Sequence, residues 1–422
     1  MSKTVVGISH ENPHYFTING ELRLLISSAE HYGALVNRAF DYVRYFRELR
    51  KNGFNQTRLF AGSYFERASD FSFDSNPLAP GAENLVPLFA GPEKTRLHPE
   101  YVERLRAILT AADEAGVVVE LTLFCVFYNE GNYLDSPLHD PAVDRREFFE
   151  ALTEEQKRYV RLVLAELEPF DNVIVELINE PYWMVRRMEP VLRFQQELAE
   201  LIRECAPGKP VAWNVDNTLS CAFDGVPGAD VLNFHYMRPE CVLANWHRQR
   251  PIVDDETGFC GSANRPYREE AYLALLAGAA GYSNLDMAYT VEAPDGTERC
   301  SEQCTHGGGK SFHRELAALA AFLGRFDFSK ARPAFEMFRP ECRSAALSLG
   351  GGRYLAYAAE TAGKVLAVSL PAGEYCLRWF DPVTTELLKE EKHVSNELWM
   401  RPVTPPTEGE MLLEVCRVGT GD

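Results

Sequence analysis

The chain of 422 residues has few cysteines, no long apolar run and fewer basic than acidic side chains. Its ten cysteines include one close pair, Cys300 and Cys304, whose CxxxC spacing has no second pair to complete a zinc site. This pattern favours reduced, mostly buried thiols over a disulfide scaffold. The longest stretch rich in uncharged apolar residues, 271–285, is too short to cross a bilayer.

The first residues, MSKTVVGISHENPHYF, have neither the apolar region nor the cleavage site of a signal peptide, so we expect a cytoplasmic protein. The 43 basic and 61 acidic side chains give a net charge of −18. Such a surface repels phosphate backbones and anionic lipid, which argues against nucleic-acid and membrane partners. We expect no cofactor and no metal.

The first two thirds of the chain alternate strand-like and helix-like patterns. Eight apolar segments predict strands at 24–28, 55–61, 117–128, 172–178, 210–215, 230–235, 251–255 and 282–289. Helical spacing predicts helices at 37–51, 99–115, 146–168, 187–205, 242–248, 268–279 and 312–326. Eight strand–helix units over about 300 residues favour a (β/α)₈ barrel. The alternative, a doubly wound open sheet, would more often show a glycine-rich turn after an early strand, and none is present.

The composition changes near residue 332. Short strand-like segments such as YLAYAAE and EYCLRWFD follow, joined by turns that contain glycine or proline. This indicates an α/β chain with two domains: a (β/α)₈ barrel at 1–332, preceded by a hairpin that turns at Asn19-Gly20, and an antiparallel β-sandwich at 333–422.

Two apolar strands end in acidic residues. The segment VIVELINEPYW, 173–183, ends in Asn179-Glu180-Pro181, where proline stops the strand and presents Glu180 at its end. The segment PIVDDETGF, 251–259, ends in Glu256 before Gly258. Strand alternation places Asp254 and Glu256 on one face and Asp255 on the other, so Glu256 is the predicted partner and Asp255 the alternative.

The carboxyl ends of barrel strands meet at one mouth, so Glu180 and Glu256 are expected to face each other there. Two opposed carboxyl groups are what glycoside hydrolysis requires: one acid protonates the departing oxygen, and one carboxylate attacks the anomeric carbon. Arg58, at the end of the second strand, is expected to keep one of the two ionised. The predicted substrate-binding residues at these strand ends are Arg58, Asn179, His235, Tyr236, Trp183, His31 and Tyr289.

These segments resemble clan A, the large group of retaining glycoside hydrolases with (β/α)₈ barrels that includes cellulases and β-galactosidases, over most of residues 15–330. The resemblance implies that Glu180 is the general acid/base, Glu256 the nucleophile and Arg58, within GFNQTR, the arginine of strand two. It also implies a role for Asn179 at the sugar 2-hydroxyl, and for the residues 378–386 (RWFDPVTTE) in a small C-terminal sandwich. The expected substrate is an oligosaccharide or other β-glycoside.

Two departures from that pattern affect the lining of the site. The clan often has His-x-Tyr on strand six, whereas Met237 stands here, so the tyrosine that touches the nucleophile should be Tyr236 or come from elsewhere. No tryptophan ends strand eight, and Tyr289 is the nearest substitute.

Two other functions fit the same residues. Glu180, Asp216, His235 and Glu256 could hold Mg²⁺ or Mn²⁺ in a sugar isomerase or epimerase barrel. A catalytically inactive carbohydrate-binding barrel is the other possibility, although binding alone does not require two opposed carboxylates.

Overall fold

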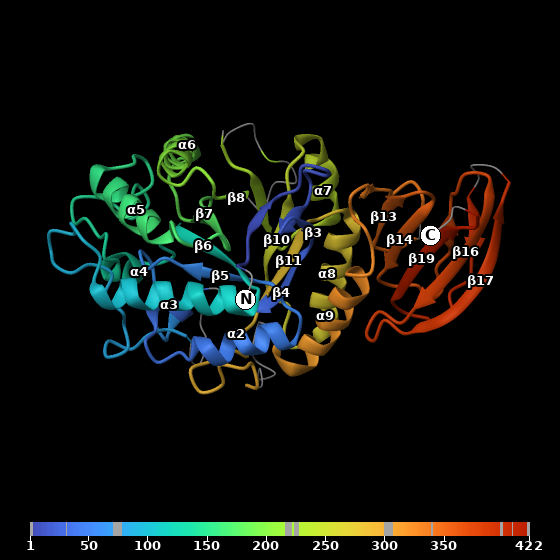
Figure 1. Cartoon of the computed structure of the whole chain (residues 1–422), viewed down its shortest axis with the longest axis horizontal. Coiled ribbons are helices and arrows are strands. Elements are labelled where there is room, and N and C mark those ends of the chain that lie inside the picture. Colours follow the sequence, from blue (N-terminus) through green and yellow to red (C-terminus); the bar gives the residue numbers. More distant parts are fainter. Residues whose placement is uncertain are drawn as a thin grey trace.

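The computed structural model describes residues 3–30, 32–70, 78–215, 222, 228–298, 307–338, 341–396, 400–406 and 408–419. Its centre is a parallel sheet that confirms the predicted (β/α)₈ barrel (Figure 1). The strands of this sheet are β4 (Leu25–Ala29), β5 (Gln56–Phe60), β6 (Val118–Cys125), β7 (Val173–Asn179), β8 (Val211–Val215), β9 (Val231–His235), β10 (Ile252–Thr257) and β11 (Gly281–Leu285).

Helices surround the sheet in the described ranges. They are α1 (Gly33–Val36), α2 (Tyr42–Lys51), α3 (Pro99–Ala115), α4 (Glu130–Asp135), α5 (Glu154–Leu167), α6 (Met188–Cys205), α7 (Pro239–Asn245), the 3₁₀ turn η2 (Trp246–Arg248), α8 (Asn264–Ala277) and α9 (Gly309–Leu323). None of these is both long and apolar enough to cross a bilayer.

Local signals decide where the helices begin and end. The helix predicted at 99–115 is found at those residues, because Pro99 opens it and Gly116, at φ 76°, closes it. The helix predicted at 146–168 begins only at Glu154, because Thr153 and Gln156 form a capping box. The helix predicted at 37–51 begins at Tyr42, where the side chain of Asp41 accepts a hydrogen bond from the backbone N–H of Arg44.

The strand order in the sheet is β4-β11-β10-β9-β8-β7-β6-β5, which leaves β4 and β5 to meet. Asn55 joins them: its Nδ2 donates to the carbonyl of Leu24 (2.8 Å), and its Oδ1 accepts from the N–H of Ile26 (2.8 Å). One asparagine therefore closes the barrel immediately before the strand that carries Arg58.

Three further sheets flank the barrel in the described ranges. At the N-terminus, β1 (Val6–Ile8), β2 (Phe16–Ile18) and β3 (Glu21–Arg23) form an antiparallel sheet whose predicted turn at Asn19-Gly20 has positive φ at both residues. After the barrel come β12 (Arg332–Pro333), β13 (Ser344–Gly350), β14 (Arg353–Ala358), β15 (Leu366–Val368), β16 (Gly373–Phe380), β17 (Leu387–Ser395), β18 (Arg401–Val403) and β19 (Met411–Arg417).

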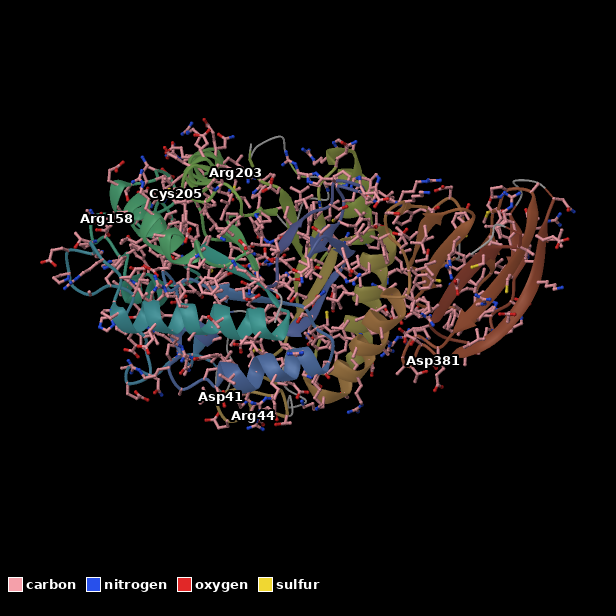
Figure 2. All side chains as sticks on the ribbon, in the orientation of Figure 1. Asp41, Arg44, Arg158, Arg203, Cys205 and Asp381 are labelled. Atoms are coloured by element: carbon pink, nitrogen blue, oxygen red, sulfur yellow. The ribbon has the colours of Figure 1, made fainter. Side chains whose placement is uncertain are left out.

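The central strands of the six-stranded sheet in this C-terminal part, β13, β14 and β19, are largely buried on both faces. One face packs on the two-stranded sheet of β15 and β18, and the other joins the hydrophobic core of the barrel through residues such as Leu347 and Leu412. At the junction, Tyr272 of α8 stacks on Tyr357 and donates to the carbonyl of Pro382, next to Asp381 (Figure 2). Because the core is continuous there, the division of the chain at 332 into two domains stays a prediction.

Candidate active site

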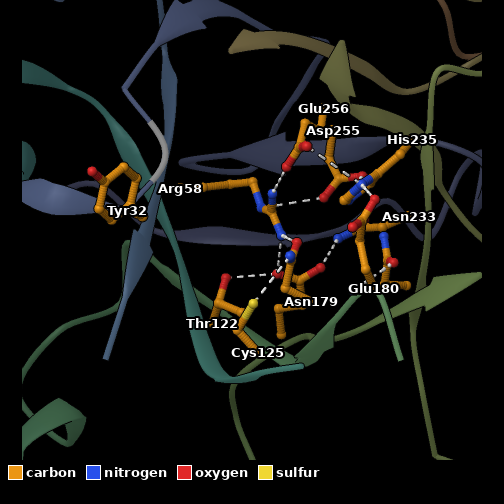
Figure 3. Close-up of polar contacts among 12 residues, drawn as sticks. Tyr32, Arg58, Thr122, Cys125, Asn179, Glu180, Asn233, His235, Asp255 and Glu256 are labelled. Atoms are coloured by element: carbon orange, nitrogen blue, oxygen red, sulfur yellow. Dashed lines mark hydrogen bonds and ion pairs between the residues drawn. The ribbon is translucent and has the colours of Figure 1, made fainter. Parts of the chain in front are cut away.

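Arg58 is the centre of a buried polar cluster inside the barrel (Figure 3). Its Nη1 donates to Glu256 Oε2 (2.8 Å), and its Nη2 donates to Glu176 Oε2 (2.6 Å) and Asn179 Oδ1 (2.7 Å). Its Nε lies 3.3 Å from Asp255 Oδ2. Burial lowers the pKa of Arg58, but the carboxylates of Glu176 and Asp255 outweigh burial and hold that pKa well above its ordinary value. The guanidinium therefore stays charged beside Glu256.

Glu180 and Glu256 meet at the mouth of the barrel, as the sequence predicts. A carboxylate oxygen of each lies within 4.8 Å of the other. The ring of His235 lies between them, with Nδ1 3.0 Å from Glu180 Oε1 and 3.7 Å from Glu256 Oε1. Strands three places apart along the sheet thus bring two carboxyl groups and one imidazole into contact.

Tyrosine hydroxyls orient both carboxyl groups. Tyr128 donates to Glu180 Oε2 (2.6 Å), and Tyr182 donates to Glu180 Oε1 (3.4 Å). Tyr236 donates to Glu256 Oε1 (2.9 Å). Of the two possibilities that the sequence left open, the tyrosine that contacts Glu256 is therefore Tyr236. Each acid therefore accepts from at least one phenol, while only Glu256 accepts from Arg58 among the hydrogen bonds shown.

Three residues at the ends of these strands have the left-handed backbone that non-glycine residues avoid: Glu180 (φ 49°), Tyr236 (φ 54°) and Phe259 (φ 58°). Asn214 holds Glu180 in this conformation by accepting its backbone N–H (3.1 Å). On a regular strand, neighbours such as His235 and Tyr236 would point to opposite faces. The left-handed backbone at Tyr236 instead lets both side chains point inward, and that of Tyr236 reaches Glu256. Such strain persists where the surrounding structure enforces it, and it is concentrated at functional sites.

The alternation expected at the end of β10 is wrong. Asp254 pairs with Phe234 while Glu256 pairs with His235, so Asp255 is an extra residue on this strand. This β-bulge turns Asp255 and Glu256 both toward Arg58. Asp254 instead accepts a hydrogen bond from the backbone N–H of Met237 (3.2 Å).

A layer of buried polar side chains lies beneath the acid pair, and the sequence analysis missed it. Thr122 donates to Glu176 Oε2 (2.6 Å), Asn233 bridges Glu176 and Glu120, and Gln56 donates to Glu120 Oε2 (2.9 Å). Burial, with the charges of Glu176 and Asp255, raises the pKa of Glu120 to about 8. The available signal was a glutamate in the middle of each of two apolar strands, VVVELTLF and VIVELIN.

The protonation of His235 bears on the metal alternative. Burial lowers its pKa, but the carboxylates of Glu256 and Asp255 outweigh burial and hold the pKa well above its ordinary value. The donor atoms of Glu180, His235 and Glu256 are close enough to surround an ion, as are those of Glu176, His235 and Asp255. An imidazolium cannot coordinate a metal, so a cation here must first displace a proton. Asp216 lies outside the described residues.

The remaining predicted residues separate into three cases. Trp183 lies at the mouth, three residues after Glu180, with its side chain 44% exposed. His31 lies outside the described residues. Tyr289 is a correction: it is fully buried, packs on Tyr45 and His313, and shows no contact with either acid. The strand predicted at 282–289 ends at Leu285, and the following turn carries Tyr289 away from the mouth.

No protein-family model matches the chain, and the sequence matches no curated protein. Solved structures match its fold. A glycoside hydrolase family 5 structure from Bacteroides vulgatus ATCC 8482 has a TM-score of 0.71 at 13% identity, with 100% of this chain and 95% of that chain covered. An endo-β-1,4-mannanase from Thermotoga petrophila has a TM-score of 0.53 at 12% identity, covering 94% and 92%.

An exo-β-1,4-mannosidase from Opitutaceae bacterium strain TAV5 has a TM-score of 0.53 at 16% identity, with 76% of this chain and 63% of that chain covered. At these identities the likeness shows a shared fold. That fold, a (β/α)₈ barrel found in glycoside hydrolases and accompanied here by a C-terminal antiparallel sheet, is the one that the sequence predicts.

Proposed function

We propose that the protein is a retaining glycoside hydrolase that cleaves β-glycosidic bonds, with Glu256 as the nucleophile and Glu180 as the acid/base. The observation that carries the proposal is the approach of the two carboxyl groups, which bring oxygens within 4.8 Å of each other. Retaining glycosidases hold these groups about 5–5.5 Å apart, whereas inverting enzymes leave a wider gap for water.

In the first step, a Glu256 oxygen attacks the anomeric carbon as the bond from that carbon to the glycosidic oxygen breaks. Glu180 gives its proton to the departing oxygen, and a glycosyl ester on Glu256 remains. In the second step, the Glu180 carboxylate takes a proton from water, whose oxygen attacks the same carbon and releases Glu256. Arg58 supports this assignment, because its charge beside Glu256 favours the ionised nucleophile.

The other residues have supporting roles in the proposal. Asn179 is held by Arg58 and contacts the sugar 2-hydroxyl, and Tyr236 fixes the attacking carboxylate. His235 contributes positive charge between the acids. Two of the structural neighbours are named for action on β-1,4-mannan or β-mannosides, so β-mannosides stand first in a substrate panel.

The test begins with a panel of aryl β-glycosides. For any substrate that is hydrolysed, NMR then identifies the anomer of the sugar that is released first. Release of the β-anomer is expected, and release of the α-anomer would contradict retention. A 2-deoxy-2-fluoro β-glycoside should trap the ester, and the labelled peptide then distinguishes Glu256 from Asp255.

Glu180→Gln and Glu256→Gln should each lower turnover by about 10³-fold or more with the thermal midpoint retained. Near-normal activity of Glu256→Gln would show that the assignment is wrong. Chelator treatment separates the metal alternative: a glycosidase of this kind keeps its activity, and a metal-dependent isomerase loses it.

A further inference from the structure

The two proposed catalytic acids have matching surroundings on the outer rim of the mouth. Trp183 follows Glu180 by three residues, and Phe259 follows Glu256 by three residues. Both aromatic side chains are large and only half-buried, with exposed fractions of 44% and 51%. Phe259 has no part in the acid–base chemistry proposed above, and the sequence analysis did not select it.

Each exposed ring contacts a tyrosine that holds one acid. The centroid of Trp183 lies 6.3 Å from that of Tyr182, which donates to Glu180. The centroid of Phe259 lies 5.9 Å from that of Tyr236, in an edge-on contact, and Tyr236 donates to Glu256. The same order of groups, exposed aromatic ring, tyrosine and carboxyl group, therefore occurs twice.

The backbone gives an independent reason to single out Phe259. Its φ of 58° is in the left-handed region, which is strained for a bulky residue. A glycine at this position would remove the strain, and a polar side chain would avoid exposing an apolar ring to water. Strain and exposure together indicate that the ring is kept where a ligand contacts it.

The sheet order places the two strands that precede these rings on one half of the barrel. Between β7, which precedes Trp183, and β10, which precedes Phe259, lie β8 and β9. The leaving group of a glycosidase must reach the acid that protonates it, here Glu180, so the half of the mouth beside Trp183 receives the leaving group. The apolar faces of a pyranose ring pack on aromatic faces and exclude water from them.

We propose that Phe259 is a specificity-determining residue that, together with Trp183, holds a sugar ring in the leaving-group position. The substrate class is then a di- or oligosaccharide, with a pyranose as the leaving group instead of a small alcohol. This inference rests on the proposed glycosidase function.

The test compares two substrates that share the sugar attacked by Glu256. One is the β-linked disaccharide, whose leaving group is a sugar, and the other is the β-glycosyl fluoride, whose leaving group has no ring. Phe259→Ala should lower kcat/KM for the disaccharide by roughly 10- to 100-fold and change it by less than about twofold for the fluoride. Trp183→Ala should act in the same direction.

Phe259→Tyr keeps an aromatic face and should retain nearly the parent kcat/KM on both substrates. Leu134→Ala, which trims a 54% exposed side chain on α4, is the matched control and should change neither. Equal losses on both substrates with Phe259→Ala would show that the ring acts only by supporting Tyr236, and no loss on either would show that it has no role. Both outcomes overturn the inference and leave the glycosidase proposal standing. A parent protein that hydrolyses neither substrate, nor any other glycoside, overturns both.

Discussion

Two arginines are each surrounded by acidic residues: Arg58 inside the barrel, and Arg268 between the barrel and the C-terminal sheet. The acids around Arg268 accept hydrogen bonds from its guanidinium, whereas not all of those around Arg58 do. Arg268 of α8 pairs with Glu315 of α9 and with Glu410, which also accepts from Tyr357 (2.6 Å). In this cluster the named acids are bound by cations and by a phenol. It joins two helices and a sheet, and it has the features of a structural connection.

The cluster around Arg58 is rich in acidic residues, and several of its buried charges pair without hydrogen-bond geometry. Three carboxyl groups, those of Glu176, Asp255 and Glu256, contact this one guanidinium. Arg58 Nε and His235 Nε2 face the two oxygens of buried Asp255 at 3.3 and 3.6 Å, in ion pairs that lack hydrogen-bond geometry. Buried charges that pair without good hydrogen bonds add little to the stability of the fold, so a cluster that keeps them is arranged for chemistry more than for stability.

The largest difference between the clusters should appear when the central charge is removed. Arg58→Gln leaves three buried carboxyl groups without their cation, so we expect activity to fall by about 10³-fold or more and unfolding to become easier by about 3–5 kcal/mol. Enzyme kinetics and denaturant unfolding measure the two effects. Arg265→Gln, on an arginine that is half exposed, is the control and should change stability by less than about 1 kcal/mol. Parent-like activity in Arg58→Gln would contradict the functional reading of this cluster.

Removing one phenol tests the orientation of the proposed nucleophile, Glu256. Tyr236→Phe deletes the hydroxyl that donates to Glu256 Oε1 and keeps the ring that contacts Phe259. We expect kcat to fall by roughly 10- to 100-fold with little change in the thermal midpoint. If the variant instead loses enough stability to explain its lower activity, Tyr236 has a structural role like that of Arg268.

Arg268→Gln should affect stability alone. The change leaves Glu315 and Glu410 without their shared cation, which should lower the free energy of unfolding by about 1–3 kcal/mol. Because Arg268 contacts neither of the proposed catalytic acids, kcat/KM at a temperature well below the midpoint should stay within about twofold of the parent. A selective fall in activity would show that the two clusters are coupled through α8.

The sequence predicted the barrel and the meeting of Glu180 and Glu256 at its mouth, because strand periodicity marks strand ends and the carboxyl ends of barrel strands share one mouth. It could not predict which neighbours point inward. The bulge at Asp255 and the left-handed backbone at Tyr236 each reverse the alternation that a regular strand imposes. Tyr289 was misplaced for a related reason: β11 ends four residues before it, and turns do not follow strand periodicity.

The most gradual expected effect concerns Glu120, which belongs to the Arg58 cluster. Burial, reinforced by the charges of Glu176 and Asp255, raises its pKa from 4.5 to about 8, so the folded protein binds a proton between these values that the unfolded chain releases. The stability from this proton is complete below the unfolded pKa and is lost as the pH rises through the folded pKa. Unfolding by denaturant should therefore become easier from about pH 5 to about pH 8, by at most about 1.4 kcal/mol per pH unit.

Glu120→Gln should flatten this pH dependence, because the amide resembles the protonated acid in shape and cannot ionise. Part of the slope should remain in both proteins, since burial also raises the pKa of Glu30 to about 7. A variant whose slope equals that of the parent would show that Glu120 is not the titrating group. The Arg268 cluster holds no carboxyl group assigned such an extra proton. Arg268→Gln removes two charge pairs and should therefore lower the free energy of unfolding by the same amount at every pH in this range. If the slope of unfolding free energy against pH flattens in Glu120→Gln and not in Arg268→Gln, the extra proton of the folded protein lies in the acid-rich interior of the barrel.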